Sequence, residues 1–277
     1  MTPPPSPTTV ILLGTGTSVG VPVIGCRCPV CTSGHPANNR TRCSLHLRQE
    51  DLSLLIDSGP DLRQQALRES LTRVDAVFYT HAHLDHLAGF DELRAFCWDR
   101  ESPLPLYAGP ETHATLERMF PWAFDHGNPG YVRPDPLVLA GPVSIGGLTV
   151  TPVPVEHAGI ETFGFRFDFP GAQSLAYLSD VKRIPDSSRA LLGDLDILII
   201  DALRDFDHPT HMTLREALAA TGRLAPKQAL FTHLAHEIGY EEVSARLPPG
   251  VSLACDGLRL HFRPGESCSM VAPFDSP

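Results

Sequence analysis

Three histidines and one aspartate stand within the six residues 81–86, in the order His81, His83, Asp85, His86. Neutral imidazoles and carboxylates are the ligands that borderline divalent metals such as Zn²⁺ favour. His81 and His83 are two residues apart, so in an extended chain both rings point to the same side. Asp85 and His86 follow where we expect the chain to turn into a helix, so they face a neighbouring spot. This segment therefore predicts ligands for two adjacent metal sites, against the alternative of a histidine-rich surface loop.

Three more candidate ligands follow β-like runs elsewhere in the chain, just as residues 81–86 follow the run 74–79. His157 comes after the run 148–155, Asp180 after 174–179, and His233 after 228–232. Taken singly, an Asp at a strand end is more often a turn or capping residue, and a His is more often a hydrogen-bonded residue at the rim. Their repeated place after apolar runs favours the metal-ligand interpretation.

The order His-x-His-x-Asp-His, followed by a lone His, an Asp and a late His, resembles the signature of metallo-β-lactamase-fold hydrolases. The resemblance runs from a strand beginning at Val10 to about Leu260. It implies an α/β fold, a four-layer αββα sandwich in which two mixed β-sheets are flanked by helices. It also implies two divalent catalytic metals, Zn or Mn. One would be held by His81, His83 and His157, the other by Asp85, His86 and His233, with Asp180 bridging.

The chain has seven cysteines, an odd number that argues against a disulfide framework. Cys26, Cys28 and Cys31 have the Cys-x-Cys-x-x-Cys spacing that suits three thiolates on one zinc, and His236 is the candidate fourth ligand. This motif and the later Thr-His-x-x-His pair resemble those of the cyclic phosphodiesterase associated with carbon–phosphorus lyase, which implies one structural Zn. The alternative is a set of reduced, buried cysteines beside a surface His. The remaining four, expected to be packing residues, are Cys43, Cys97, Cys255 and Cys268.

The expected catalytic residues are Asp85, Asp57 and His211. Asp57 is a candidate for orienting a ligand imidazole, and its alternative role is that of a helix-start carboxylate. The resemblance places a non-ligand catalytic His just before a helix that we expect Thr213 to cap. His211 fits that position, where it would donate a proton to the leaving alkoxide or bind phosphate. His208 is the competing candidate.

The resemblance implies a phosphodiesterase that acts on a small phosphodiester, such as a phosphoribosyl or nucleoside cyclic phosphate, by attack of metal-bound hydroxide. Linear diesters are compatible too. A nuclease of the tRNA 3′-processing type would carry a long basic arm, which we do not find. A thioester hydrolase of this fold would lack the cysteine motif, and a non-enzymatic metal-stabilised binding module is the alternative outside catalysis. Relatives are often dimers, so a homodimer is possible.

Two further segments could contribute to the site. The glycine-rich loop 14–20 lacks the Lys of a phosphate loop, so we interpret it as a tight turn that brings backbone close to the metals. The insertion 101–135 carries five side chains that would cover the site and stack on a base or ribose, unless it is a packed loop. They are Trp122, Phe124, His126, Tyr131 and Arg133.

Composition predicts one domain over residues 10–262, with a disordered tail 1–9 and a C-terminal tail 263–277. The 277 residues are 42% hydrophobic, and their formal net charge of −10 argues against a large nucleic-acid surface. No run approaches the roughly 18 apolar residues of a membrane span, and residues 1–7 do not read as a signal peptide, so we expect no membrane association and a cytoplasmic protein. We expect helices over 61–70, capped by Asp61, and over 84–96.

Overall fold

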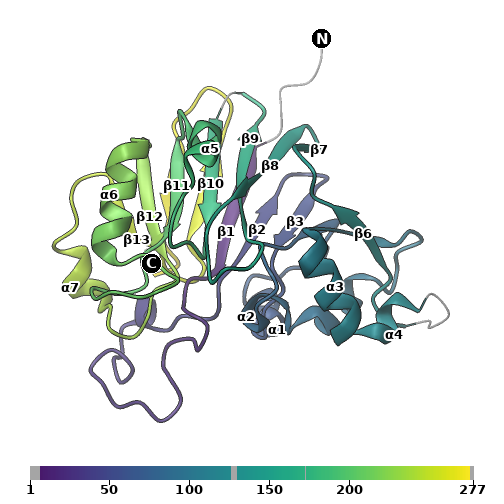
Figure 1. Cartoon of the computed structure of the whole chain (residues 1–277), viewed down its shortest axis with the longest axis horizontal. Coiled ribbons are helices and arrows are strands. Elements are labelled where there is room, and N and C mark those ends of the chain that lie inside the picture. Colours follow the sequence, from purple (N-terminus) through teal and green to yellow (C-terminus); the bar gives the residue numbers. More distant parts are fainter. Residues whose placement is uncertain (1–6, 126–129, 172, 275–277) are drawn as a thin grey trace.

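Two β-sheets face each other in the computed structural model, which describes residues 7–125, 130–171 and 173–274 (Figure 1). In the first sheet the strands lie side by side in the order β15 (Ser269–Val271), β14 (Arg259–Phe262), β1 (Thr8–Gly14), β2 (Ser44–Arg48), β3 (Ser53–Ile56), β4 (Ala76–Phe78), β5 (Leu104–Ala108) and β6 (Pro134–Val138). In the second the order is β13 (Val251–Leu253), β12 (Gln228–Thr232), β11 (Ile197–Asp201), β10 (Gln173–Leu178), β9 (Phe163–Phe169), β8 (Leu148–Pro154) and β7 (Val143–Ile145).

Both sheets are mixed, as the sequence predicts. Strands β1 to β3 pair antiparallel, whereas β3 to β6 pair parallel. In the second sheet β7 to β10 pair antiparallel and β10 to β13 pair parallel. Strands β8, β10, β11 and β12 therefore run in the same direction, and their carboxyl ends share one edge of the sheet, where functional loops of such sheets gather.

The helices cover the outer faces of both sheets (Figure 1). The helices on the first sheet are α1 (Leu62–Arg68), α2 (Leu84–Leu87), α3 (Pro110–Met119) and α4 (Pro121–Phe124). The helices on the second sheet are α5 (Asp186–Arg189), α6 (Leu214–Leu224) and α7 (Tyr240–Ser244). Short 3₁₀ turns are η1 (Pro36–Asn38), η2 (Phe90–Phe96) and η3 (Ala190–Leu192). Helices outside two stacked sheets make the predicted four-layer αββα sandwich.

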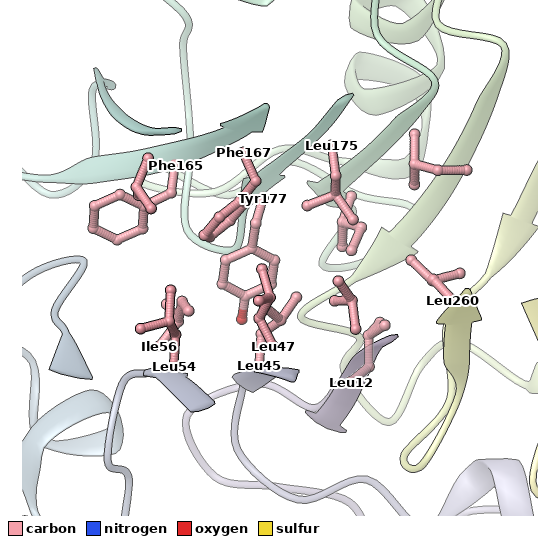
Figure 2. Close-up of a cluster of buried hydrophobic side chains, with 14 of the residues drawn as sticks. Leu12, Leu45, Leu47, Leu54, Ile56, Phe165, Phe167, Leu175, Tyr177 and Leu260 are labelled. Carbon is pink, nitrogen blue, oxygen red and sulfur yellow. The ribbon is translucent and has the colours of Figure 1, made fainter. Parts of the chain in front are cut away.

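The central core forms where the inner faces of the sheets meet (Figure 2). Alternate residues of β2, such as Leu45 and Leu47, point toward Phe165, Phe167 and other side chains of the opposite sheet, and all of these are fully buried. Burying a Leu or Phe side chain contributes about 1.5–3 kcal/mol. Separate apolar clusters lie under the helices on each outer face. This packing makes a rigid support for the loops at the strand ends.

Helix α6 begins as predicted. The Thr213 hydroxyl accepts a hydrogen bond from the Glu216 N–H at 3.1 Å, and the Glu216 carboxylate accepts one from the Thr213 N–H at 2.7 Å. These two bonds form a capping box. Since His211 lies two residues before Thr213, the capped helix fixes the segment that carries it.

Nowhere in residues 7–125, 130–171 and 173–274 is a helix both long and apolar enough to span a bilayer.

Two helix predictions need correction. The expected continuous helix 84–96 is broken into α2 and η2, because Gly89 lies against another segment: a Cβ atom there would stand 2.1 Å from the carbonyl oxygen of Gly59. Asp61 precedes α1 but makes no side-chain capping bond. Its carboxylate instead accepts hydrogen bonds from the Arg42 backbone N–H at 2.9 Å and from the Arg42 guanidinium.

The two predicted tails are partly described. Strand β1 begins at Thr8, inside the segment 1–9, and residues 1–6 lie outside the described structure. Within 263–277, the strand Ser269–Val271 pairs antiparallel with β14 and extends the first sheet. This end of the chain thus adds an edge strand to the sheet, up to the last described residue at position 274.

Candidate metal centre

The candidate ligands come from loops that follow strands of both sheets. His81 and His83 follow β4, and Asp85 and His86 lie on α2; opposite them, β8, β10 and β12 lead into His157, Asp180 and His233. Strands β8, β10 and β12 are parallel to one another, so the last three residues emerge at one sheet edge. The fold therefore gathers all seven predicted ligands at one place, although they span more than half of the sequence.

Three histidines form the first group. His81 Nε2 lies 2.9 Å from His83 Nδ1, and His157 Nε2 lies 3.1 Å from the same atom. Burial lowers the pKa of each of these imidazoles, well below the ordinary range for His81, so they are neutral at physiological pH. A neutral imidazole offers a lone pair, and three nitrogen lone pairs that converge within a few ångströms suit a divalent metal.

Asp85, His86, Asp180 and His233 form the second group. His86 Nε2 lies 3.3 Å from Asp85 Oδ2 and 3.2 Å from Asp180 Oδ1. His233 Nε2 lies 3.3 Å from Asp180 Oδ2. The same Oδ2 atom lies 4.0 Å from His81 Nε2 and 3.9 Å from His157 Nε2, in the first group. Asp180 thus stands between the two groups, as a bridging carboxylate would.

Unpartnered polar atoms at this place fit bound metals. Buried polar atoms are nearly always hydrogen-bonded. Within the described structure, however, His86 Nε2, Asp180 Oδ1 and both ring nitrogens of His233 are buried without a hydrogen-bond partner. Cations at the centre of the two groups would satisfy these atoms, apart from His233 Nδ1, which lies on the side of the buried Asp201 carboxylate.

The outer nitrogens of two ligand imidazoles are held by acceptors. His157 Nδ1 lies 2.8 Å from the carbonyl oxygen of Thr210, which can only accept, so Nδ1 carries the proton. His86 Nδ1 lies 2.7 Å from Asp57 Oδ2 and donates to it. Each bond leaves the Nε2 lone pair free on the side of the other candidate ligands, which is the usual arrangement around histidines that bind a metal.

Asp57 extends this support to a third imidazole. Its carboxylate accepts hydrogen bonds from the Thr80 N–H at 2.8 Å and the Thr80 hydroxyl at 2.9 Å. Since that hydroxyl donates to Asp57, its oxygen accepts from His81 Nδ1 at 2.9 Å. Burial raises the pKa of Asp57, and its φ of 62° is in the left-handed region. Asp57 therefore contacts the outer side of the His86 ring directly and of the His81 ring through Thr80, and it is not part of a helix.

His211 lies beside both groups. Its ring centroid is 4.6 Å from that of His157 and 4.5 Å from that of His233. Its Nδ1 lies 2.7 Å from Asp201 Oδ2, on the last residue of β11. Burial opposes protonation of His211, but the hydrogen bond and the charge of Asp201 raise its pKa overall. The structure thus brings His211 to the metal groups with one nitrogen held and the other free.

Asp201 is a functional candidate that the sequence analysis missed as such. It is fully buried, and burial raises its pKa to about 7. Its Oδ1 lies 3.8 Å from His233 Nδ1, so the carboxylate stands between two histidines of the site. The available signal was its place directly after the apolar run 195–200, the pattern that marked Asp180.

His208 lies farther from the cluster. Its ring centroid is 5.0 Å from that of His211, and its Nδ1 accepts from the Thr210 N–H at 3.3 Å. It belongs to none of the groups of converging ligand atoms among the described residues, whereas His211 belongs to two. The geometry therefore places His211, and not His208, among the converging candidate ligands.

The cysteine motif and His236 meet as predicted. His236 Nδ1 lies 3.3 Å from Cys26 Sγ, 3.5 Å from Cys28 Sγ and 3.6 Å from Cys31 Sγ. The Cys31 N–H donates to Cys28 Sγ, and this hydrogen bond is the largest cause that lowers the pKa of Cys28 to about 6. Three sulfurs and one imidazole, converging with no disulfide formed, are a donor set that fits a closed zinc site.

The glycine-rich loop lies against the second metal group. The Thr17 N–H donates to the carbonyl of Leu234, next to His233, and the Leu234 N–H donates to the carbonyl of Thr15 at 2.9 Å. A Cβ atom on Gly16 would stand 2.7 Å from the carbonyl oxygen of Arg40, so the close approach requires glycine. The loop supports the backbone that carries His233.

The insertion 101–135 packs Phe120 and Phe124 into the outer core, whereas Trp122 and Tyr131 are exposed. Phe120 and Phe124 stack on Phe90, with ring centroids 4.7 Å and 6.2 Å apart, and Trp122 lies edge-on to Phe120. Arg133 donates a hydrogen bond to the Arg100 carbonyl. The packed-loop alternative accounts for these contacts, and His126 lies outside the described residues.

Comparisons with known proteins agree with this geometry. Residues 53–234 match a family model described as a beta-lactamase superfamily domain. A crystal structure of "a New Diphosphatase from the PhnP Family" superposes with a TM-score of 0.86 and 40% identity, over 92% of this chain and 97% of that one. Zn²⁺-bound PqqB from Methylobacterium extorquens superposes with a TM-score of 0.76 over 91% of this chain and 99% of that one, and its 23% identity shows the fold alone.

Two curated relatives are much longer than their matched parts. An octanoyltransferase of Porphyromonas gingivalis is 34% identical over 259 residues, which cover 90% of this chain and 50% of that protein. A ribonuclease Z of Bradyrhizobium diazoefficiens is 30% identical over 149 residues, which cover 50% of this chain and 48% of that protein. The matched regions thus span about half the length of each.

Proposed function

We propose that this chain, which belongs to the β-lactamase superfamily and within it to the PhnP family, hydrolyses a small phosphodiester at a two-metal centre. The chain is a metal-dependent hydrolase by family, and the phosphodiester is our specific inference. The carrying observation is His211, an imidazole held by Asp201 at 2.7 Å beside two groups of converging ligands. A cyclic phosphate on a ribosyl or nucleoside unit is the substrate class that we favour.

Seven side chains would hold the two metals. The first metal would be held by His81, His83 and His157, the second by Asp85, His86 and His233, with Asp180 shared. Two bound divalent metals, Zn or Mn, would supply Lewis acidity, lower the pKa of a water and neutralise charge on the phosphoryl oxygens.

The chain itself supplies the tautomers and the proton. Asp57 and Thr210 fix two ligand imidazoles with their Nε2 atoms inward. Asp201 accepts from His211 Nδ1, so in the imidazolium the Nε2–H is free to donate to the leaving oxygen. A leaving alkoxide is strongly basic and departs much faster when it is protonated. This requirement fits an ester of an ordinary alcohol.

Hydrolysis of a diphosphate is the second candidate. The relative that is 40% identical is titled a diphosphatase, and a phosphoanhydride presents the same non-bridging oxygens to two metals. Its leaving phosphate is less basic than an alkoxide, so it depends less on His211. This difference separates the two candidates by experiment.

The test uses protein stripped with a chelator and reloaded with Mn²⁺ or Zn²⁺. A panel of a ribosyl cyclic phosphate, a nucleoside 2′,3′-cyclic phosphate, a linear dinucleotide, a diphosphate diester, an octanoyl thioester and bis(p-nitrophenyl) phosphate is assayed. We expect the cyclic phosphates to react fastest. Asp180→Asn should abolish turnover, whereas the matched control Asp168→Asn, on β9 and paired with Arg166, should retain it.

Each contrary result points to another function. Preference for the diphosphate favours the second candidate. Turnover of the thioester alone would make the chain a thioester hydrolase, and preference for long RNA would make it a nuclease. No turnover above the metal-free blank on any substrate would favour the binding module and refute the enzymatic proposal.

A further inference from the structure

Arg40 buries its whole guanidinium group, with 1% of the residue exposed. Its Nε donates to the Ala37 carbonyl at 3.1 Å and its Nη1 to the Ala235 carbonyl at 3.0 Å. Its Nη2 donates to Asn38 Oδ1 at 3.0 Å and to the Ile238 carbonyl at 2.7 Å. All four acceptors are uncharged. A buried cation without an anionic partner is unfavourable unless something nearby compensates its charge.

The contacts of Arg40 join the two halves of the cysteine–histidine site. Its backbone pairs with Val21, with hydrogen bonds of 2.7 and 2.8 Å, and the nearby Val23 N–H donates to Cys31 Sγ at 3.3 Å. Its side chain donates hydrogen bonds to the carbonyls of Ala235 and Ile238, which lie on either side of His236 in the sequence. One residue thus fixes both the loop that leads into the cysteines and the loop that carries the histidine.

The charge of that site complements Arg40. Ligand cysteines bind as thiolates, so three thiolates and a neutral imidazole around a divalent cation leave one net negative charge. Burial lowers the pKa of Arg40 to about 10, so the guanidinium stays charged at neutral pH. Anionic groups oppose this lowering of the Arg40 pKa, the Asp256 carboxylate first and Cys31 of the site among the others. Asp256 makes no ion pair with Arg40 in the described structure and accepts its hydrogen bonds from Thr15, Thr41 and Arg68.

We propose that Arg40 is a positioning residue of the cysteine–histidine metal site: it holds the His236 loop against the cysteine loop and balances the charge of the metal–thiolate cluster. The same loop carries His233 three residues earlier. Arg40 therefore also links the cysteine site to the catalytic centre, through the backbone from His233 to Ile238.

The direct test measures Co²⁺ binding, because cobalt bound to thiolates gives a charge-transfer absorption that reports this site alone. Apo-protein is titrated with Co²⁺ against a competing chelator. We expect Arg40→Gln to weaken binding about 10- to 100-fold, as loss of an outer partner of a metal site typically does. Arg40→Lys keeps the positive charge but loses the planar set of guanidinium donors, so its Co²⁺ affinity should fall less than that of Arg40→Gln. Equal losses in the two variants would refute the charge balance.

The matched control is Arg166, which also donates to backbone carbonyls of a loop, those of Leu191 at 3.0 Å and Gly193 at 2.7 Å. Arg166→Gln should leave Co²⁺ affinity unchanged. If it weakens binding as much as Arg40→Gln does, the effect is general destabilisation and the proposal fails. Wild-type protein that shows no cobalt–thiolate absorption would refute the cysteine site itself, independently of the phosphodiesterase proposal.

A second variant avoids the danger that changes at Arg40 prevent folding. Asn38→Asp is isosteric, and Asp can accept from Arg40, from the Tyr240 N–H and from the Ser33 hydroxyl, the three partners of Asn38. The new carboxylate would pair directly with the Arg40 guanidinium, so the charge of Arg40 would no longer balance that of the metal–thiolate cluster. We expect about tenfold weaker Co²⁺ binding with no loss of melting temperature in the metal-free protein. Unchanged Co²⁺ affinity would overturn the proposed charge balance.

Discussion

Replacing His211 with alanine should separate substrates by their leaving groups. Proton donation to a leaving oxygen typically contributes about 10²–10⁴ in rate. His211→Ala should therefore slow hydrolysis of a nucleoside 2′,3′-cyclic phosphate, which expels an alkoxide, by about that factor. Hydrolysis of bis(p-nitrophenyl) phosphate should change little, because nitrophenolate leaves without a proton.

Replacing Asp201 with asparagine should slow the cyclic phosphate by an amount between that of the wild type and that of His211→Ala. Asp201→Asn keeps an acceptor at the 2.7 Å distance to His211 Nδ1 but removes the negative charge that Asp201 carries above its pKa of about 7. Hydrogen bonds to charged groups contribute about 1.5–3 kcal/mol and neutral ones about 0.5–1.5 kcal/mol. The difference of about 1–1.5 kcal/mol corresponds to roughly a 5- to 13-fold loss of the protonated donor. Asp201→Asn should therefore slow the cyclic phosphate by about that factor, less than His211→Ala does.

The assay is kcat/KM on both substrates at fixed metal occupancy, with metal content measured for each variant. His208→Ala is the control, since this ring lies 5.0 Å from His211 and outside the ligand groups. An equal loss on both substrates would refute proton donation and assign His211 to phosphate binding. Loss of a metal in His211→Ala would make His211 a ligand, and a selective effect in His208→Ala alone would reverse the choice between the two.

Three further predictions concern metals and pH. Elemental analysis of dialysed, active protein should find about three metals per chain, two catalytic and one structural; one or none would refute the two-site arrangement. Cys28→Ser should lower the melting temperature through loss of the structural metal, whereas Asp85→Ala should abolish turnover with the melting temperature nearly unchanged, and the reverse pattern would exchange the two roles. Burial lowers the pKa of His46 from 6.5 to about 4, so as the pH falls the unfolded chain binds the proton first, and the free energy of unfolding decreases by about 3 kcal/mol at most between pH 6.5 and 4. His46→Gln should therefore make the free energy of unfolding depend less on pH in that range. An unchanged pH dependence in this variant would contradict the lowered pKa of His46.

Much of the candidate site was determined by local sequence. Four ligands lie within residues 81–86, and a strand followed by a short turn is enough to bring them together. The cysteine spacing and the capping box at Thr213 are local in the same sense, since each depends on backbone geometry over a few residues. The predicted fold class is confirmed, because the order of apolar runs and the ligands at their ends carried the family resemblance.

Only the tertiary structure decided which distant groups meet. Asp201 and His211 are ten residues apart and His211 and His157 more than fifty. The pairing of β8 through β9 and β10 to β11 brings the ends of β8 and β11 to one sheet edge, where the three residues meet. The contact of Arg40 with the Ala235 and Ile238 carbonyls likewise joins segments about two hundred residues apart. The break between α2 and η2 comes from the approach of Gly59 to Gly89. Such contacts are set by the packing of whole sheets, whose energy is shared over many residues, so no local pattern in the sequence marks them.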